Sequence, residues 1–283
     1  MGWSLTDVQW ARSEPLLPDR TPRRGGRWRD HRQVINAIAW KYRTGSPWEA
    51  LPSELGSWKG ACNRLRKWAI DGTWERVFTA LLAQADAEKN LDWVVAVDST
   101  IIRAHQHAAG ARSEGAQVRE PADHALGRSR GGLTTKVRLA ADGNCRLLAF
   151  VLSAGQAGDA PAFEQVMTTI RVPRAQGRPR VRPAVVLADK AYSSRAIREH
   201  LRRRGIRAVI PQPADQVVNR KRRGRQGGRP PAFDRTAYKQ RNTVERCINK
   251  LKQCRGLATR YDKTITIYLA GLHLAAILIW AAR

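Results

Sequence analysis

Apolar residues recur at intervals of three and four through the first ninety positions, the period of helices that bury one face. Within 31–43, for example, the residues at 34, 35, 38, 39 and 42 are apolar. The pattern predicts helices over Asp7–Leu16, His31–Arg43, Ser57–Ile70 and Trp74–Ala87. We therefore expect a small all-helical domain over residues 1–90. Short helices with basic faces are typical of helix-turn-helix DNA-binding domains, although a helical packing module without DNA contact gives the same pattern.

From residue 91 onward the pattern changes to that of strands. Short apolar or alternating runs predict five strands, at Val94–Val97, Leu133–Ala140, Arg146–Ser153, Val185–Ala188 and Ile206–Ile210. Asp142-Gly143, between the second and third, is a two-residue hairpin signal. Helical patterns cover Ala160–Ile170, with Asp159 as its cap, Ser193–Arg204 and Thr236–Gly256. This order predicts an α/β domain over residues 91–283 that has a five-stranded mixed sheet flanked by helices.

The last apolar stretch, Ile265–Ala282, is nearly long enough to span a bilayer. His273 in its middle and the break at Gly271 favour a buried C-terminal helix instead. The first residues lack the basic flank and apolar core of a secretory signal. We therefore expect a cytoplasmic protein without a membrane partner.

Charge narrows the class of partner. The 283 residues include 51 Lys+Arg and 24 Asp+Glu, a net charge of +27. Residues 195–260 alone carry 20 basic residues against four acids. Such an excess indicates a polyanionic partner, most simply nucleic acid, and argues against an ordinary small-molecule enzyme. The Gly/Arg/Pro segment 220–232 cannot pack a core, and we expect it to be mobile without nucleic acid.

Two carboxylates follow short apolar strands. Asp98 comes after Val-Val-Ala-Val and Asp189 after Val-Val-Leu-Ala. The carboxyl ends of strands are where a sheet presents side chains to a ligand. Each residue could instead simply cap the next turn.

A third carboxylate, Glu245, lies on the late helix, where Tyr238, Arg241, Glu245 and Lys252 share one face. Glu245 is the only acid between Thr236 and Arg260 and could be an ion-pair partner of the basic residues around it. If this helix packs near the two aspartates, three carboxylates converge and need a cation. Oxygen ligands select Mg²⁺ or Mn²⁺, and paired ions of this kind serve phosphoryl transfer on nucleic acid.

These residues resemble the DDE transposases of bacterial insertion sequences, in the IS-five group. The late helix keeps every spacing of that superfamily's Tyr-Arg-Glu-Lys signature. Other segments familiar from the group are Ala96–His107, Gly131–Lys136, Gly155–Asp159 and Leu187–Ser193. The resemblance covers nearly the whole chain.

The resemblance implies an RNase H-like fold in which Asp98, Asp189 and Glu245 hold two Mg²⁺ ions, with Mn²⁺ as a substitute. It implies an enzyme that binds terminal inverted repeats, cuts at the element ends and joins the 3′-hydroxyl to target DNA. The protein would act as a homodimer on double-stranded DNA in the bacterial cytoplasm, associated with the nucleoid. An RNase H-like nuclease without strand joining and a non-catalytic DNA-binding regulator are the alternatives.

Basic residues supply the expected DNA contacts. By the resemblance, Tyr238, Arg241 and Lys252 contact DNA near the active site. Further candidates, which could equally be solvated or structural, are Lys190, Arg222, Arg223, Arg225, Arg64, Arg66 and Lys67. His105 and His107 favour DNA contact or loop hydrogen bonds over a zinc site, because no matching Cys/His pair accompanies them. The tryptophans at 40, 48, 58, 68 and 74 favour core positions over a base-stacking platform.

Overall fold

The computed structural model describes residues 4–21, 28–113 and 120–282. The four predicted N-terminal helices form as α1 (Asp7–Ser13), α2 (His31–Thr44), α3 (Trp58–Ile70) and α4 (Thr73–Ala87). Side-chain caps fix three of their starts, since Thr6, Asp30 and Ser57 each accept a backbone amide of the first turn. A short 3-10 turn, Glu14–Leu16, finishes the helix predicted to run from Asp7 to Leu16.

Tryptophans build the centre of this helical group. Trp68 and Trp74 are fully buried, and their rings meet edge to face at 5.0 Å. Trp40, Trp48 and Trp58 are partly buried against the same core. The prediction that these side chains pack the core is therefore confirmed for the first two and agrees with the position of the other three.

Five strands of the sheet lie side by side in the order β4-β3-β1-β5-β6. Its strands are β1 (Val94–Ala104), β3 (Gly132–Ala141), β4 (Leu147–Ala154), β5 (Val185–Ala188) and β6 (Arg207–Val209). Strand β3 runs antiparallel to β1 and β4, whereas β5 and β6 run parallel to β1. This mixed sheet, a hairpin on one side of β1 and parallel strands on the other, is the topology of an RNase H-like domain.

In the residues that the structure describes, the sheet contains seven strands rather than the five predicted. The additional strands are β2 (Gly127–Ser129), which pairs with β3, and β7 (Thr259–Arg260), which pairs with β1. Both are too short for an alternating pattern to show in the sequence.

The β3–β4 hairpin closes through three residues rather than two. The amide of Asp142 donates to the carbonyl of Arg146, and Cys145, at φ 59°, takes the left-handed conformation. The Asp142 carboxylate accepts the amides of Asn144 and Arg146 and so holds the wider turn. A tight turn followed by a left-handed residue is the common three-residue form of hairpin.

Strand β1 is longer than predicted, which changes the placement of Asp98. The strand continues to Ala104 because its pairing with β3 extends to Arg103. Asp98 therefore lies within β1 rather than at its end. The parallel pairing with β5 nevertheless stops at Val97 and Ala188, so Asp98 lies at the level where β5 ends.

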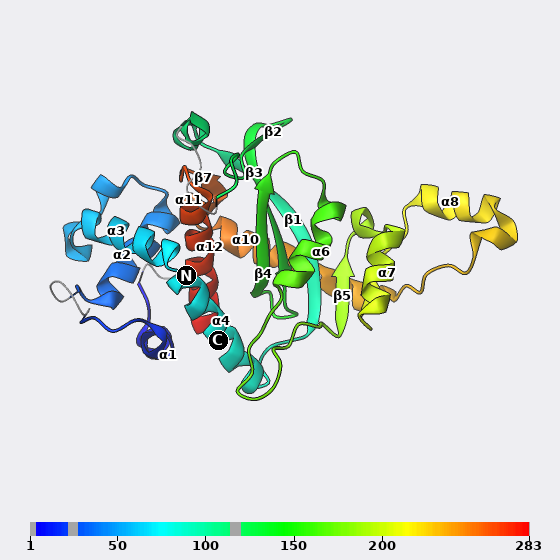
Figure 1. Cartoon of the computed structure of the whole chain (residues 1–283), viewed down its shortest axis with the longest axis horizontal. Coiled ribbons are helices and arrows are strands. Elements are labelled where there is room, and N and C mark those ends of the chain that lie inside the picture. The colour runs from blue at the N-terminus through cyan, green and yellow to red at the C-terminus, as the bar shows by residue number, and fades with distance from the viewer. Residues whose placement is uncertain (1–3, 22–27, 114–119, 283) are drawn as a thin grey trace.

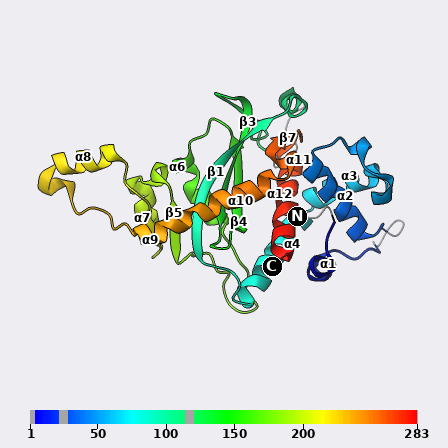
Figure 2. The same ribbon diagram turned by 180° about the vertical axis from the view of Figure 1, so that it is seen from behind.

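Helices cover both faces of the sheet. Helix α6 (Asp159–Thr169) packs on β3 and β4 from one side, and α10 (Asn242–Lys252) crosses β1 and β3 on the other (Figures 1 and 2). Asp159 is the first residue of α6 rather than its cap. Its carboxylate pairs with Lys136 and Arg138, whereas Gly158 takes the cap position without a side-chain bond.

The long helix predicted over Thr236–Gly256 is interrupted. It begins as α9 (Arg235–Tyr238), passes through a 3-10 turn (Lys239–Arg241) and continues as α10. A short helix, α11 (Arg255–Ala258), follows. The 3-10 turn packs beside β1 and β5, so the interruption lies against the sheet.

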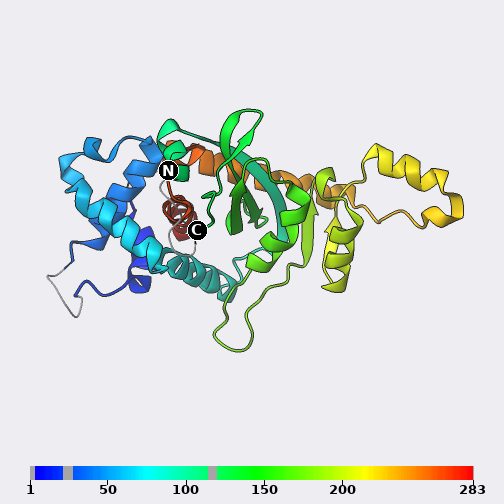
Figure 3. The ribbon, with the colours of Figure 1, turned by 45° about the horizontal axis from the view of Figure 1, so that its top comes forward.

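The C-terminal helix α12 (Ile265–Ala281) is buried, as predicted. It packs against all four N-terminal helices and against β4, and Figure 3 shows it nearly end-on between them and the sheet. No helix in the described part of the chain is long and apolar enough to cross a membrane. The division of the chain at residue 90 stays a prediction.

Three further helices complete the fold: α5 (Gln106–Ala109), α7 (Arg195–Arg203) and α8 (Ala214–Arg222). Helix α8 and the 3-10 turn after it (Gly224–Gly227) have no buried residue. They project from the body of the protein beyond α7 (Figure 1). We call residues 212–231 the arm; it packs no core, as the sequence predicts for its Gly/Arg/Pro part.

Candidate active site and nucleic-acid interface

Asp98 lies within β1 and Asp189 directly follows the neighbouring strand β5, each one residue beyond the last parallel pair of the two strands. One carboxylate oxygen of each accepts a backbone amide, from Ser99 at 2.8 Å and from Ala191 at 2.9 Å. Asp189 thus caps the short turn Lys190–Tyr192, the alternative that the sequence left open. In the described residues its second oxygen makes no hydrogen bond or ion pair, so it is available to a ligand.

Glu245 approaches Asp98 from helix α10, which packs on β1 and β3. It lies in the first turn of α10, and its carboxylate contacts the guanidinium of Arg241 one turn earlier. The same guanidinium donates to the second oxygen of Asp98 at 2.5 Å. Arg241 therefore bridges Asp98 and Glu245, and the ion-pair reading of Glu245 is also correct.

Opposing charges set the proton affinities in this cluster. Burial raises the pKa of Asp98, the amide of Ser99 and the Arg241 charge act against it, and Asp189 and Glu245 raise it further. Burial by itself would lower the pKa of Arg241, but Asp98 and Glu245 outweigh it and raise that pKa. The ion pair favours both charged forms, so the raised pKa of Asp98 reflects burial and the other two carboxylates rather than its bond to Arg241.

A hard divalent cation fits the donor chemistry of this site. All three candidate side chains are carboxylates, which are the ligands that Mg²⁺ and Mn²⁺ prefer. A cationic group already lies between Asp98 and Glu245, which shows that positive charge is accommodated there. In the described residues no three His, Cys, Asp or Glu side chains are arranged to hold a metal ion. The Arg241 guanidinium occupies one oxygen of Asp98 and one of Glu245, so we expect it to shift if a metal ion binds those oxygens.

Tyr238 and Lys252 occupy different environments on the same stretch of chain. Tyr238 is half-buried, its ring lies 5.2 Å from that of Phe233, and burial raises its pKa. Lys252 is exposed in the last turn of α10, about 10 Å along the axis from Glu245. Tyr238 and Arg241 thus stand beside the carboxylates, and Lys252 lies further along the helix.

A buried polar cluster supports the sheet on the α6 side. Lys136 and Arg138 of β3 both pair with Asp159 at 3.3 Å, and Arg138 donates to the carbonyls of Ala157 and Gly158. This cluster joins two segments singled out in the sequence, Gly131–Lys136 and Gly155–Asp159. Arg138 was missed there, because a charged residue in an alternating strand reads as an exposed position.

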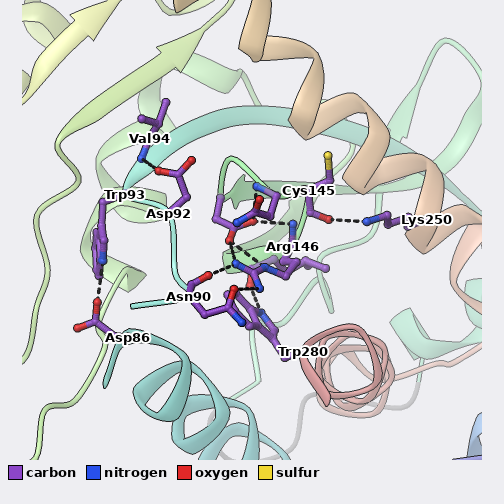
Figure 4. A network of polar contacts seen from close by, with 12 residues as sticks. Asp86, Asn90, Asp92, Trp93, Val94, Cys145, Arg146, Lys250 and Trp280 are labelled. Carbon is purple, nitrogen blue, oxygen red and sulfur yellow. Dashed lines mark hydrogen bonds and ion pairs between the residues drawn. The ribbon is translucent and has the colours of Figure 1, made fainter. Parts of the chain in front are cut away.

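Figure 4 shows how the far end of α10 is held. Lys250 donates to the carbonyl of Cys145 in the hairpin turn, and Arg146 pairs with the buried Asp142 at 2.6 Å. The Arg146 guanidinium also donates to Asn90 and lies 4.1 Å from the ring of Trp280. These contacts tie α10, the hairpin and α12 together.

The other predicted DNA contacts lie apart from the carboxylates, except Lys190, which follows Asp189. Arg66 and Lys67 are exposed on α3. The Arg64 guanidinium bonds His31 at 2.9 Å and lies 4.1 Å from the ring of Trp28, so it already packs within the helical group. Exposed positions on the arm are occupied by Arg222, Arg223 and Arg225.

The rings of His105 and His107 meet edge to face with centroids 4.5 Å apart, and the His105 ring also contacts that of Tyr261. The Nδ1 atom of His105 accepts the amide of His107 at the start of α5. This is the loop hydrogen bonding that the sequence favoured over zinc.

The sheet order places the chain in the RNase H-like class, with Asp98, Asp189 and Glu245 as its candidate site residues. Comparison with known families makes the assignment specific. Residues 89–280 match the family described as "Transposase DDE domain", and residues 5–78 match "Putative transposase of IS4/5 family (DUF4096)". The chain belongs to the DDE transposases of insertion sequences and is a DNA transposase, and its N-terminal part is similar to transposases of the IS4/5 family.

Two individual relatives are also proteins of insertion sequences. The chain is 30% identical over 148 residues to a Brucella ovis protein named "Putative transposase for insertion sequence element IS6501"; the match covers 52% of this chain and 98% of that protein. It is 37% identical over 107 residues to a 16.2 kDa protein of insertion element IS402 from Burkholderia cepacia, covering 35% of this chain and 73% of the relative.

Among solved structures, the chain is similar to a Mos1 transposase paired-end complex and to the Mos1 strand transfer complex. The first has 13% identity and a TM-score of 0.25 over 86% of this chain and 83% of that one. The second has 13% identity and a TM-score of 0.27 over 85% and 82%. At TM-scores this low, no residue of this chain can be equated with a particular residue of the Mos1 transposase.

Proposed function

We propose that this transposase binds the terminal inverted repeats of its own element, cleaves DNA at the element ends and joins the freed 3′-hydroxyl to target DNA. The carboxylates of Asp98, Asp189 and Glu245 would hold two Mg²⁺ ions, with Mn²⁺ as a substitute. The observation that carries this proposal is the position of Arg241, whose guanidinium joins Asp98 to Glu245 at the level of Asp189. This position supports the proposal that three carboxylates from three separate elements serve one site.

The carboxylates and the basic residues of the site would have different roles. Bound divalent ions supply activation of the attacking oxygen and stabilisation of the leaving oxygen. Asp98 and Asp189 are oriented by the amides of Ser99 and Ala191, which leaves one oxygen of each directed to the site. Arg241, released from the carboxylates, would hold a phosphate beside the scissile one, and Tyr238 and Lys252 would extend that contact along the strand.

Double-stranded DNA is the proposed partner, both as terminal repeat and as target. The exposed basic residues Arg66 and Lys67 on α3 would contact the backbone, which gives the helices of residues 1–90 a DNA-binding role. Two element ends must be held together for joining, so we propose a homodimer on DNA.

Purified protein and a labelled duplex carrying the DNA that borders the gene test the chemistry. With Mg²⁺, wild type should nick the duplex at the element boundary, and Glu245→Gln should reduce the rate by at least about 10³, because the amide cannot replace a carboxylate ligand. Glu54→Gln, a matched change at an exposed position, should cut normally. Equal cutting by Glu245→Gln and wild type would refute the assignment.

Strand joining separates a transposase reaction from plain nuclease action. Pre-cut ends with a free 3′-hydroxyl should be joined to plasmid DNA by wild type and not by Glu245→Gln. Cutting without any joining would favour the nuclease alternative, and binding without cutting would favour the regulator.

A further inference from the structure

A second basic feature is a cleft of about 530 Å³ between helix α7 and the arm. We call it the arginine cleft. Its basic lining residues come from both sides and are Arg195, Arg198, Arg202, Arg220, Arg223 and Arg229. Glu199 is the one acid in the lining. The sequence shows the charge of this region, but it does not show that α7 and the arm face each other, because β6 separates them in the chain.

Most of this charge is not neutralised within the protein. Glu199, the acid in the cleft lining, pairs with Arg195 at 2.7 Å, so its charge offsets that of one arginine. In the described part of the chain, Arg202, Arg223 and Arg229 have no side-chain hydrogen bond or ion pair, and the Nε atom of Arg220 is buried without a partner. Like charges held this close repel, so the cleft favours a bound polyanion.

The cleft is connected to the acidic site. Its inner wall is fixed by the hydroxyl of Ser193, which donates to Gln216 of the arm at 2.8 Å. Ser193 is buried and follows Asp189 by four residues, with the exposed Lys190 between them. A second bond, from the Arg198 guanidinium to the carbonyl of Ile210 at 2.9 Å, holds α7 to the chain just before the arm. One lining residue of the cleft, Ser193, therefore lies close in the chain to Asp189, and the basic residue Lys190 lies between the two.

We propose that the arginine cleft binds the phosphate backbone of the DNA segment that leaves the carboxylates on the side of Asp189. The proposal rests on the proposed function in taking DNA as the substrate. Guanidinium groups bind phosphate oxygens in pairs and suit backbone contact without base reading. The charge continues past the cleft on the exposed Lys221, Arg222 and Arg225 of the arm, further than a mononucleotide would require. A continuous polyanion fits this track.

The salt dependence of DNA binding tests this. The triple variant Arg202→Ala, Arg220→Ala, Arg223→Ala is compared with Arg171→Ala, Arg178→Ala, Arg182→Ala, which removes the same charge from exposed positions between α6 and β6. The probe is a fluorescein-labelled duplex of the gene's bordering DNA, in EDTA. Loss of three phosphate contacts should lower the slope of log affinity against log salt by about 2.7. The control should change it by less than about 1. Equal changes in the two triple variants overturn the proposal.

Two local measurements keep the test decisive if the triple variant misfolds. Gln216→Glu leaves every arginine in place but adds a carboxylate to the cleft, and should weaken duplex binding at least about threefold; unchanged binding overturns the proposal. A p-benzoyl-phenylalanine placed at Asn219, an exposed lining residue, should crosslink to the labelled duplex. Failure to crosslink, or loss of the crosslink with equimolar inorganic pyrophosphate or single-stranded RNA, overturns it as well.

These experiments need no cleavage, so their outcome is separate from that of the active-site proposal. A protein that crosslinks DNA from Asn219 but never cuts it would refute the proposed function and leave the cleft assignment standing. A protein that cuts but gives no crosslink would do the reverse.

Discussion

Removal of the Arg241 side chain should have opposite effects on metal affinity and on DNA cleavage. Its guanidinium pairs with Asp98 and Glu245 and would compete there with a metal ion. DNA-free protein carrying Arg241→Met should therefore bind Mn²⁺ more tightly than wild type. We expect about threefold to tenfold, because a partly exposed ion pair contributes about 1 kcal/mol and a tenfold change is about 1.4 kcal/mol. Cleavage by the same variant should fall, since a phosphate contact is lost. Isothermal titration with Mn²⁺ and a cleavage assay measure the two effects.

Arg246→Met is the matched control, because Arg246 is exposed on the same helix. It should leave Mn²⁺ affinity unchanged. Weaker Mn²⁺ binding in Arg241→Met would contradict the competition and would mean that Arg241 helps to position the carboxylates.

Residue types and spacing were sufficient to select Asp98, Asp189 and Glu245 as candidates. Their convergence was conditional in the sequence, since it required the late helix to pack on the sheet, and the structure packs α10 there. What spacing could not give is the direction of Arg241. A shared helix face allows its side chain to reach either a phosphate or a carboxylate, and only the position of Asp98 on the neighbouring strand decides which is closer.

At the scale of elements, the β3–β4 turn should be a stability determinant. Asp142 is fully buried and pairs with Arg146. Arg146→Met should destabilise the fold by about 3–5 kcal/mol, because it leaves a buried carboxylate without a cationic partner. Urea unfolding at neutral pH measures this.

The double variant Asp142→Asn, Arg146→Met should recover part of that loss, since no buried charge then remains. Arg178→Met, at an exposed position, should change stability by no more than about 0.5 kcal/mol. A similarly small effect of Arg146→Met would show that the turn does not depend on the pair.

His273 of helix α12 should make the free energy of unfolding depend on pH. Burial lowers the pKa of His273 to about 4, so the folded protein keeps the ring neutral while the unfolded chain protonates near 6.5. The folded-state pKa is the lower one, so stability is complete above pH 6.5 and declines between 6.5 and 4, by about 1.4 kcal/mol for each pH unit. Between pH 7.5 and 5.5, His273→Leu should lose about 1.4 kcal/mol less than wild type in urea unfolding. His107→Gln, an exposed control, should behave as wild type, and an equal loss in His273→Leu would contradict the assignment.

The elements that sequence predicted well are those with a strong period and a capping residue, such as α2 and α3. Its errors lie where pairing partners decide the outcome. Strand β1 runs on to Ala104 because β3 is long enough to pair with it. Similarly, the break between α9 and α10 occurs where the chain packs against β1 and β5, and nothing in the local sequence marks it. Tertiary contacts extend or interrupt elements in ways that periodicity alone does not carry.

For the whole molecule, the charge of +27 predicts DNA binding that weakens steeply with salt. If six or more phosphates are contacted, affinity for a duplex should fall by about 10³ or more between 50 and 200 mM salt. Fluorescence anisotropy across that range measures it. A flat dependence would contradict a backbone-dominated interface.

The central claim, that Glu245 belongs to the active site of a working transposase, is tested most directly by movement of DNA in cells. A marker flanked by the DNA bordering the gene is placed on a plasmid, and the protein is supplied separately as wild type or Glu245→Gln. The account predicts excision and integration of the marker with wild type and none with Glu245→Gln. Movement of the marker at the same frequency with both proteins would contradict it.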